Sequence, residues 1–155
     1  MKHLARMVLI SIIPFAVFMV MLYGEIDFIL EPRVSPASNM SSQEWLQTFR
    51  QLATYGIIAS WIVTLIWYDM GQWFFKVNDW RAANRRAVWG LLFLVPVGAF
   101  ALTSYFTPQA QEGAFWAYLF YFINNVTIYY LGTVLLSPPA FMYTPLGATV
   151  IRHWR

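Results

Sequence analysis

Apolar stretches without a charged residue cover most of the chain, and short charged segments separate them. The uninterrupted stretches are residues 7–24, 51–68, 87–111 and 113–151. The first two contain 18 residues each, the third contains 25 and the fourth contains 39. A helix needs about 20 mostly apolar residues to cross the hydrocarbon core of a bilayer. Each stretch is therefore long enough to hold one transmembrane helix.

Local signals delimit the first two predicted helices. Residues 7–24 follow a basic start, as in a secretory signal, but no small-residue cleavage site follows them, so we expect a retained helix. The second helix is expected to cross the membrane over 51–69 and to begin earlier. Ser41 and Glu44 fit a capping box, in which each side chain accepts from the backbone N–H of the other residue. This helix is expected to run outside the bilayer from about Ser42.

Proline residues delimit the third and fourth predicted helices. The third covers 87–107, and Pro96 within it is expected to kink the helix because proline removes one backbone donor. The last apolar stretch is too long for one crossing, and a double proline at 138–139 interrupts it. We expect a helix over 114–136, followed by a tail, 137–155, that lies on the inner membrane surface.

These patterns predict an all-α fold, a polytopic membrane protein whose single domain, residues 1–155, is a bundle of four transmembrane helices. An outer loop over 25–50 and an inner loop over 69–86 are expected to join them. Hydrophobic residues make up 59% and charged residues 11% of the chain, against about 45–50% and about 25% in soluble domains. A soluble fold of this size cannot bury so much apolar surface.

Basic residues are concentrated in the segment before residue 7, in the loop 69–86 and in the tail 137–155. Those segments hold eight of the ten Lys and Arg residues, and the remaining segments hold two. Because Lys and Arg beside membrane helices stay in the cytoplasm, we expect both termini inside, in a bacterial inner membrane. The eight are Lys2, Arg6, Lys76, Arg81, Arg85, Arg86, Arg152 and Arg155, and the two are Arg33 and Arg50.

Two adjacent amides, Asn124 and Asn125, lie near the middle of the fourth predicted helix, with Thr127 close by. An amide in hydrocarbon is costly unless it is hydrogen-bonded. These residues are interpreted either as interhelical hydrogen-bonding groups that hold a bundle or oligomer together, or as the lining of a narrow pore. Since consecutive helical residues are about 100° apart, the two amides are expected to face different neighbours.

Small residues repeat at every fourth position of the second predicted helix, at Gly56, Ser60 and Thr64. Such a pattern lets a neighbouring helix approach closely. We expect the neighbour to belong to the same chain, and contact between copies in a homo-oligomer is the alternative.

Charged residues near the predicted helix ends form an acidic group and a basic group. The acidic group is expected in the outer loop, solvated or facing lipid headgroups, with a cation site or a partner-docking patch as the alternative. The basic group is expected to contact anionic lipid at the inner face or a cytosolic partner. The acidic residues are Glu25, Asp27 and Glu31, and the basic residues are Lys76, Arg81, Arg85 and Arg86.

The residues that support common chemistries are missing from the sequence. The chain has no Cys, which excludes disulfides, thiol nucleophiles and Cys-ligated metals. Its only histidines, His3 and His153, lie near the chain ends, so no predicted helix offers a haem or metal ligand. No acid is expected within a membrane span, which disfavours a proton pump with a membrane carboxylate. We therefore expect neither a cofactor nor a metal.

The sequence thus predicts a non-enzymatic small integral membrane protein that acts through protein–protein contacts, as a subunit or assembly factor of a larger membrane complex. Its expected partners are the bilayer and other membrane proteins, not nucleic acid. A homo-oligomeric channel or small-solute carrier is one alternative. An immunity or exclusion protein that recognises a toxin or secretion machine in the membrane is another. An enzyme that acts on lipid or quinone ranks last.

Overall fold

The computed structural model describes residues 2–37, 40–74, 82–137, 141 and 144–148, and within them the fold is all-helical apart from one short β-ribbon. Each of the four long helices among these residues is long and apolar enough to cross a membrane. The elements are α1 (Lys2–Val20), η1 (Met21–Leu30), β1 (Ser35–Pro36), α2 (Ser42–Asp69), η2 (Met70–Phe74), α3 (Ala82–Phe106), β2 (Ala110–Glu112) and α4 (Ala114–Leu136).

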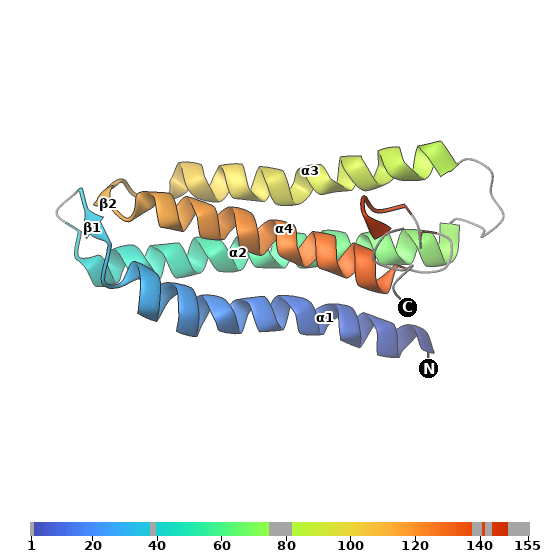
Figure 1. Ribbon diagram of the computed structural model, residues 1–155, viewed down its shortest axis with the longest axis horizontal. Coiled ribbons are helices and arrows are strands. Elements are labelled where there is room, and N and C mark those ends of the chain that lie inside the picture. Colours follow the sequence, from blue (N-terminus) through green and yellow to red (C-terminus); the bar gives the residue numbers. More distant parts are fainter. Residues whose placement is uncertain (1, 38–39, 75–81, 138–140, 142–143, 149–155) are drawn as a thin grey trace.

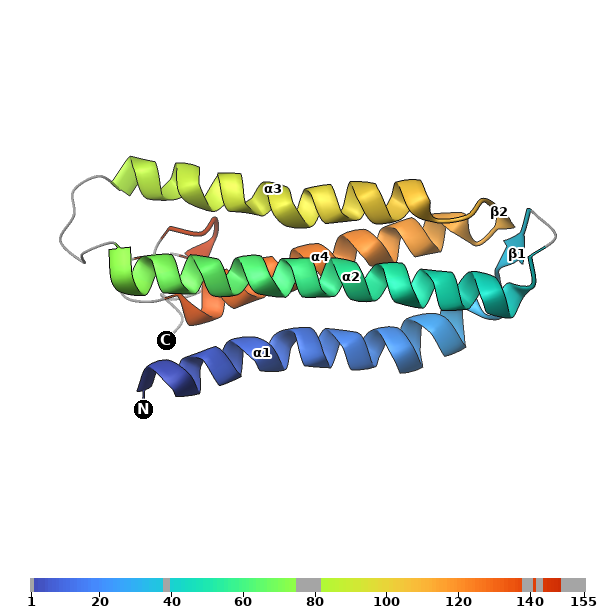
Figure 2. The ribbon, with the colours of Figure 1, turned by 180° about the vertical axis from the view of Figure 1, so that it is seen from behind.

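Helices α2 and α4 form the centre of the bundle, and α1 and α3 flank them on opposite sides (Figures 1 and 2). Both flanking helices pack against both central ones. Within the most apolar part of each helix, half of the residues of α4 and 39% of those of α2 are buried, but only 17% of those of α1 and of α3. The flanking helices therefore present most of their apolar surface outward.

The strands β1 and β2 pair antiparallel and join the loops at one end of the bundle, which we call the β-ribbon end (Figure 1). Gly113 follows β2 with a φ of +85°, and a Cβ there would lie 2.9 Å from the backbone oxygen of Arg33. Only glycine suits this conformation and this close approach. The turn starts α4 directly against the loop that follows η1.

The helix limits follow the local signals in the sequence. Ser41 and Glu44 form the predicted capping box, with Glu44 N donating to Ser41 Oγ over 3.2 Å and Ser41 N donating to Glu44 Oε2 over 2.9 Å. Helix α3 runs through Pro96 and ends before Thr107, and α4 has the bounds expected for the fourth helix. The kink at Pro96 stays a prediction.

The first helix is longer than the sequence indicated, because α1 continues as the π-helical segment η1 to Leu30 rather than ending at Gly24. Its last turn is closed by Glu31 N, which donates to Ile26 O over 2.8 Å. The predicted helix stopped before Glu25 because that residue is charged, although apolar residues follow it. This difference matters because η1 carries Glu25 and Asp27 of the expected outer loop, and Glu31 follows it directly.

The described part of the C-terminal tail packs against the bundle, and its place on the inner membrane surface stays a prediction. The ring of Phe141 is buried and stacks on Trp67 of α2, with 3.9 Å between ring centroids. Tyr130 of α4 donates its hydroxyl to Leu146 O over 2.9 Å. An aromatic pair of this kind contributes about 0.5–1.5 kcal/mol beyond the area that it buries. The tail therefore belongs to the bundle at these residues.

Candidate functional site: a buried polar layer and an open polar groove

A carboxyl–amide pair lies inside the bundle, where Asn124 Nδ2 of α4 donates to Glu25 Oε2 of η1 over 2.9 Å. Glu25 is 5% exposed and Asn124 is 4% exposed. Helical side chains lean toward the N-terminus of their own helix. Because α1 starts at the end opposite the β-ribbon and α4 starts beside it, the two side chains lean toward one another.

This position of Glu25 corrects the expectation that it lies in a solvated outer loop. Glu25 is buried, and it falls within the candidate membrane span Leu4–Leu30. One acid therefore lies inside a candidate span, where the sequence predicted none. Sequence reasoning missed the pair because its amide is 99 residues away along the chain. The only sequence signal was the run of large apolar residues, Ile26, Phe28, Ile29 and Leu30, that follows Glu25 around Asp27.

The second amide, Asn125, faces α2 instead. Ser60 Oγ donates to Asn125 Oδ1 over 3.4 Å. A Cβ on Gly56 would lie 2.7 Å from Asn125 Oδ1, so only a glycine leaves room for this amide. The two amides thus face different helices, as their angular separation predicts. We call Glu25, Asn124, Asn125 and Ser60 the buried polar layer.

The small-residue stripe of α2 lies against α4 of the same chain. Thr64 is buried beside Gly132, where a Cβ would come within 2.5 Å of Thr64 Cγ2. Together with the contact between Gly56 and Asn125, this places glycines on both central helices at their closest approach. The stripe therefore serves packing within the bundle, and α2 does not present it to a second copy.

The remaining predicted residues have varied positions. Thr127 is half-buried on α4, and Pro96 is buried inside α3. Arg86 is exposed, but Arg85 is only 7% exposed, which differs from the expected surface contact. The spacing explains this burial, since Arg85 lies four residues before the buried Trp89 and shares its face of α3. Lys76 and Arg81 lie outside the described residues.

Hydrogen-bonded aromatic side chains fill the bundle at the end opposite the β-ribbon, and sequence reasoning did not select them. Trp67 Nε1 donates to Ser137 Oγ over 2.9 Å, and Trp89 Nε1 donates to Thr133 Oγ1 over 3.0 Å. Tyr129 donates its hydroxyl to the backbone oxygen of Trp89 over 2.8 Å. The available signal was the spacing of Thr133 on α4 and Ser137 directly after it, which are four residues apart.

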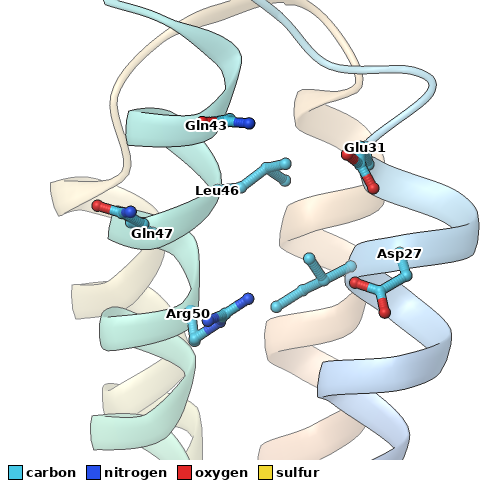
Figure 3. A pocket seen from close by; sticks show the side chains of 7 residues that line it. Asp27, Glu31, Gln43, Leu46, Gln47 and Arg50 are labelled. Carbon is cyan, nitrogen blue, oxygen red and sulfur yellow. The ribbon is translucent and has the colours of Figure 1, made fainter.

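An open polar groove of about 220 Å³ lies between η1 and α2 at the β-ribbon end. In Figure 3, Asp27 and Arg50 extend into it from opposite walls, and Glu31 and Gln43 lie nearer the loops. One wall is therefore acidic, and the other carries a guanidinium and amides. The groove is lined by Ile26, Asp27, Glu31, Gln43, Leu46, Gln47 and Arg50.

Helical periodicity separates these acids from Glu25. Residues two positions apart lie on nearly opposite sides of a helix, so Asp27 points away from the face that carries Glu25. Glu25 faces α4 through its hydrogen bond with Asn124, whereas Asp27 and Glu31 are exposed and line the groove. The two sets of acids in one segment therefore have different chemistry available to them.

The groove is suited to a ligand that carries both charges, because a guanidinium binds phosphate or carboxylate and carboxylates bind ammonium groups. Within the described part of the chain, no group of three or more His, Asp or Glu side chains is arranged to hold a metal ion. Comparison with known proteins finds no matching family model, no similar curated protein and no similar solved structure.

Proposed function

We propose that this protein is a small integral membrane protein that acts without catalysis, through contacts with other membrane proteins, as a subunit or assembly factor of a larger complex. The observation that carries the proposal is a pair of open glycines on α3. A Cβ added at Gly90 or at Gly98 would meet no atom within 4 Å. Glycine costs a helix about 1 kcal/mol relative to alanine, and no packing among the residues that the structure describes explains these two.

The open glycines lie on one outward face of α3. Residues 87, 90, 94, 98 and 101 follow helical spacing, and they are Ala, Gly, Leu, Gly and Ala. Both alanines and Leu94 are exposed, and the glycines are half-buried. Small residues on an exposed face let the backbone of a second helix approach closely. This face is therefore where we expect a helix of the partner.

The orientation proposed for the protein puts the β-ribbon end outside and both termini in the cytoplasm of a bacterial inner membrane. Arg33 and Arg50 lie at the β-ribbon end, and Arg6 and Arg86 lie toward the opposite end. The excess of Lys and Arg in the segments away from the β-ribbon supports this orientation. Because the chain has no Cys, single cysteines at Gln43 and Arg86 can be compared for labelling by a membrane-impermeant maleimide.

The homo-oligomeric pore has less support, because the amides on which it was based contact groups inside one chain. Asn124 bonds to Glu25, and Asn125 accepts from Ser60. Both are buried, so neither is exposed to line a channel between copies. Contacts through the outer face of α3 need no such residues.

Site-specific photo-crosslinking in native membranes tests the proposed function. A photoreactive residue at Leu94 of α3 is compared with one at Ile12 of α1, which is also exposed. Adducts with another protein are expected at Leu94 and not at Ile12, and Gly98→Leu should abolish them. Adducts between copies would identify a homo-oligomer instead. An isolated monomer on native gels, without adducts at either position, would overturn the proposal.

A further inference from the structure

We infer that the seam between α1–η1 and α2 binds a zwitterionic aminophospholipid, with its phosphate at Arg50 and its primary ammonium at the acidic wall. One acyl chain would follow the seam toward the centre of the bundle. The inference rests on the proposed membrane insertion but not on the proposed contacts with other proteins. The groove and an apolar groove beside it provide the observations.

The apolar groove, of about 280 Å³, lies between α1 and α2. Its polar atoms near α1 include Ser11 Oγ, which accepts from Trp61 Nε1 over 3.2 Å. Phe15 of α1 and Ile58 of α2 are exposed beside it. The groove is lined by Ser11, Pro14, Phe15, Phe18, Thr54, Ile57, Ile58 and Trp61.

The two grooves are consecutive parts of one seam. Their α2 residues repeat at intervals of three or four and so lie on a single face of the helix. Arg50 and Thr54 are one turn apart, and Thr54 Oγ1 donates to Arg50 O over 2.7 Å. The α2 residues of the polar groove are Gln43, Leu46, Gln47 and Arg50, and those of the apolar groove are Thr54, Ile57, Ile58 and Trp61.

The length of the seam fits one leaflet. From Arg50 to Trp61 the α2 axis rises about 16 Å, at 1.5 Å per residue. Half of a hydrocarbon core of roughly 30 Å has about the same depth. A lipid whose phosphate lies at Arg50 would therefore place its acyl chain beside the apolar groove. A polar peptide bound at the polar groove would not be expected to extend into the apolar groove.

The order of charges along the polar groove fits a headgroup. Arg50 lies next to the apolar groove, whereas Glu31 and Gln43 lie nearer the β-ribbon end (Figure 3). A phospholipid carries its phosphate close to the glycerol and its amine farther out, in the same order. Guanidinium groups bind phosphate through paired hydrogen bonds, and a primary ammonium can donate to Asp27 and Glu31. An anionic lipid without an amine would meet uncompensated carboxylates.

Native mass spectrometry of the full chain, released from detergent after equilibration with lipid, tests the inference. The probes are the dioleoyl forms of phosphatidylethanolamine, phosphatidylglycerol and phosphatidylcholine, and soluble phosphoethanolamine. Phosphatidylethanolamine is expected to be retained about tenfold more than either of the other lipids, a factor that corresponds to 1.4 kcal/mol. Retention of phosphoethanolamine alone would identify a headgroup site without a lipid, and equal retention of all lipids would overturn the inference.

Three variants and one control resolve the parts of the site. Arg50→Gln should reduce retention of every phospholipid, and Asp27→Asn combined with Glu31→Gln should remove only the preference for the amine. Ile58→Trp, at an exposed position that lines the apolar groove, should fill that groove and lower retention without changing a charge. Glu112→Gln changes an exposed acid on β2, outside the groove, and should behave as the unchanged chain does.

The failure of this inference can be told apart from the failure of the proposed function. Lipid preference is measured on the purified chain, which needs no partner. If no crosslinks form at Leu94 but the preference for phosphatidylethanolamine is present, only the proposed protein contacts would be overturned. A preference that survives the double acidic substitution would overturn only the lipid site. Extraction of the chain from membranes by alkali would overturn both.

Discussion

Glu25 and Asp27 are two residues apart in η1, yet one lies in the buried polar layer and the other in the open polar groove. Glu25 is 5% exposed and accepts one hydrogen bond from Asn124. Asp27 is exposed and shares a groove with Arg50 on the opposite helix. Buried polar groups here have fixed partners, so they specify how helices pack. Groups in the groove face open space, so they are available to a ligand.

This comparison predicts where substitutions matter. A change in the buried polar layer should alter the free energy of unfolding, because a buried group that loses its partner keeps its desolvation cost. A change in the groove should leave the fold intact and alter binding. The four predictions below run from the largest expected effect on stability to the smallest.

Gly56→Leu should have the largest effect, a loss of about 3 kcal/mol in the free energy of unfolding, the upper range for overpacking. Its Cβ alone would lie 2.7 Å from Asn125 Oδ1. Gly98→Leu is the matched control, because a Cβ there meets no atom within 4 Å. Unfolding of the purified chains in detergent measures both. Equal losses in the two variants would mean that the central helices do not pack as closely as described.

Asn124→Leu should cost about 2 kcal/mol, because it leaves the carboxyl of Glu25 buried without its donor. Replacing both partners with apolar residues, as Glu25→Leu with Asn124→Leu, should recover most of that loss. Comparing the single and double variants in the same unfolding assay isolates the contribution of the Glu25–Asn124 contact to stability. If the double variant were less stable than Asn124→Leu alone, the buried pair would not be the source of the cost.

Trp67→Phe tests whether fixed polar contacts at the other end of the bundle behave like the buried layer. It removes the hydrogen bond to Ser137 and keeps an aromatic ring against Phe141. The expected loss is about 1 kcal/mol in the free energy of unfolding. Trp116→Phe, at a position that is 39% exposed, should cost less. An equal cost at both positions would remove the role assigned to the indole of Trp67.

Local patterns in the sequence were sufficient to locate the four long helices, although not the end of the first one. Apolar stretches located each one, and the capping box at Ser41 set the start of α2. The double proline at 138–139 set the end of α4 near Leu136. These signals act within a few residues along the chain, which is why they can be read without knowing the tertiary structure.

The contacts between helices could not be predicted in the same way. Glu25 is buried because an amide 99 residues away donates to it, and nothing near Glu25 in the sequence indicates that amide. The groove between Asp27 and Arg50 likewise lies between two helices that only the tertiary structure places side by side.

Arg50→Gln should have the smallest effect on stability, within about 0.5 kcal/mol, as for most exposed positions. Arg50 is exposed and lies on the rim of the groove rather than in the buried layer. The same variant should lose phospholipid retention, so stability and binding should separate at this residue. Asn124→Leu should show the opposite pattern. It should lower the free energy of unfolding, and the fraction that folds should keep its lipid preference. A loss of stability at Arg50 comparable to that at Asn124 would show that its guanidinium holds the two helices together, and the contrast between layer and groove would then fail.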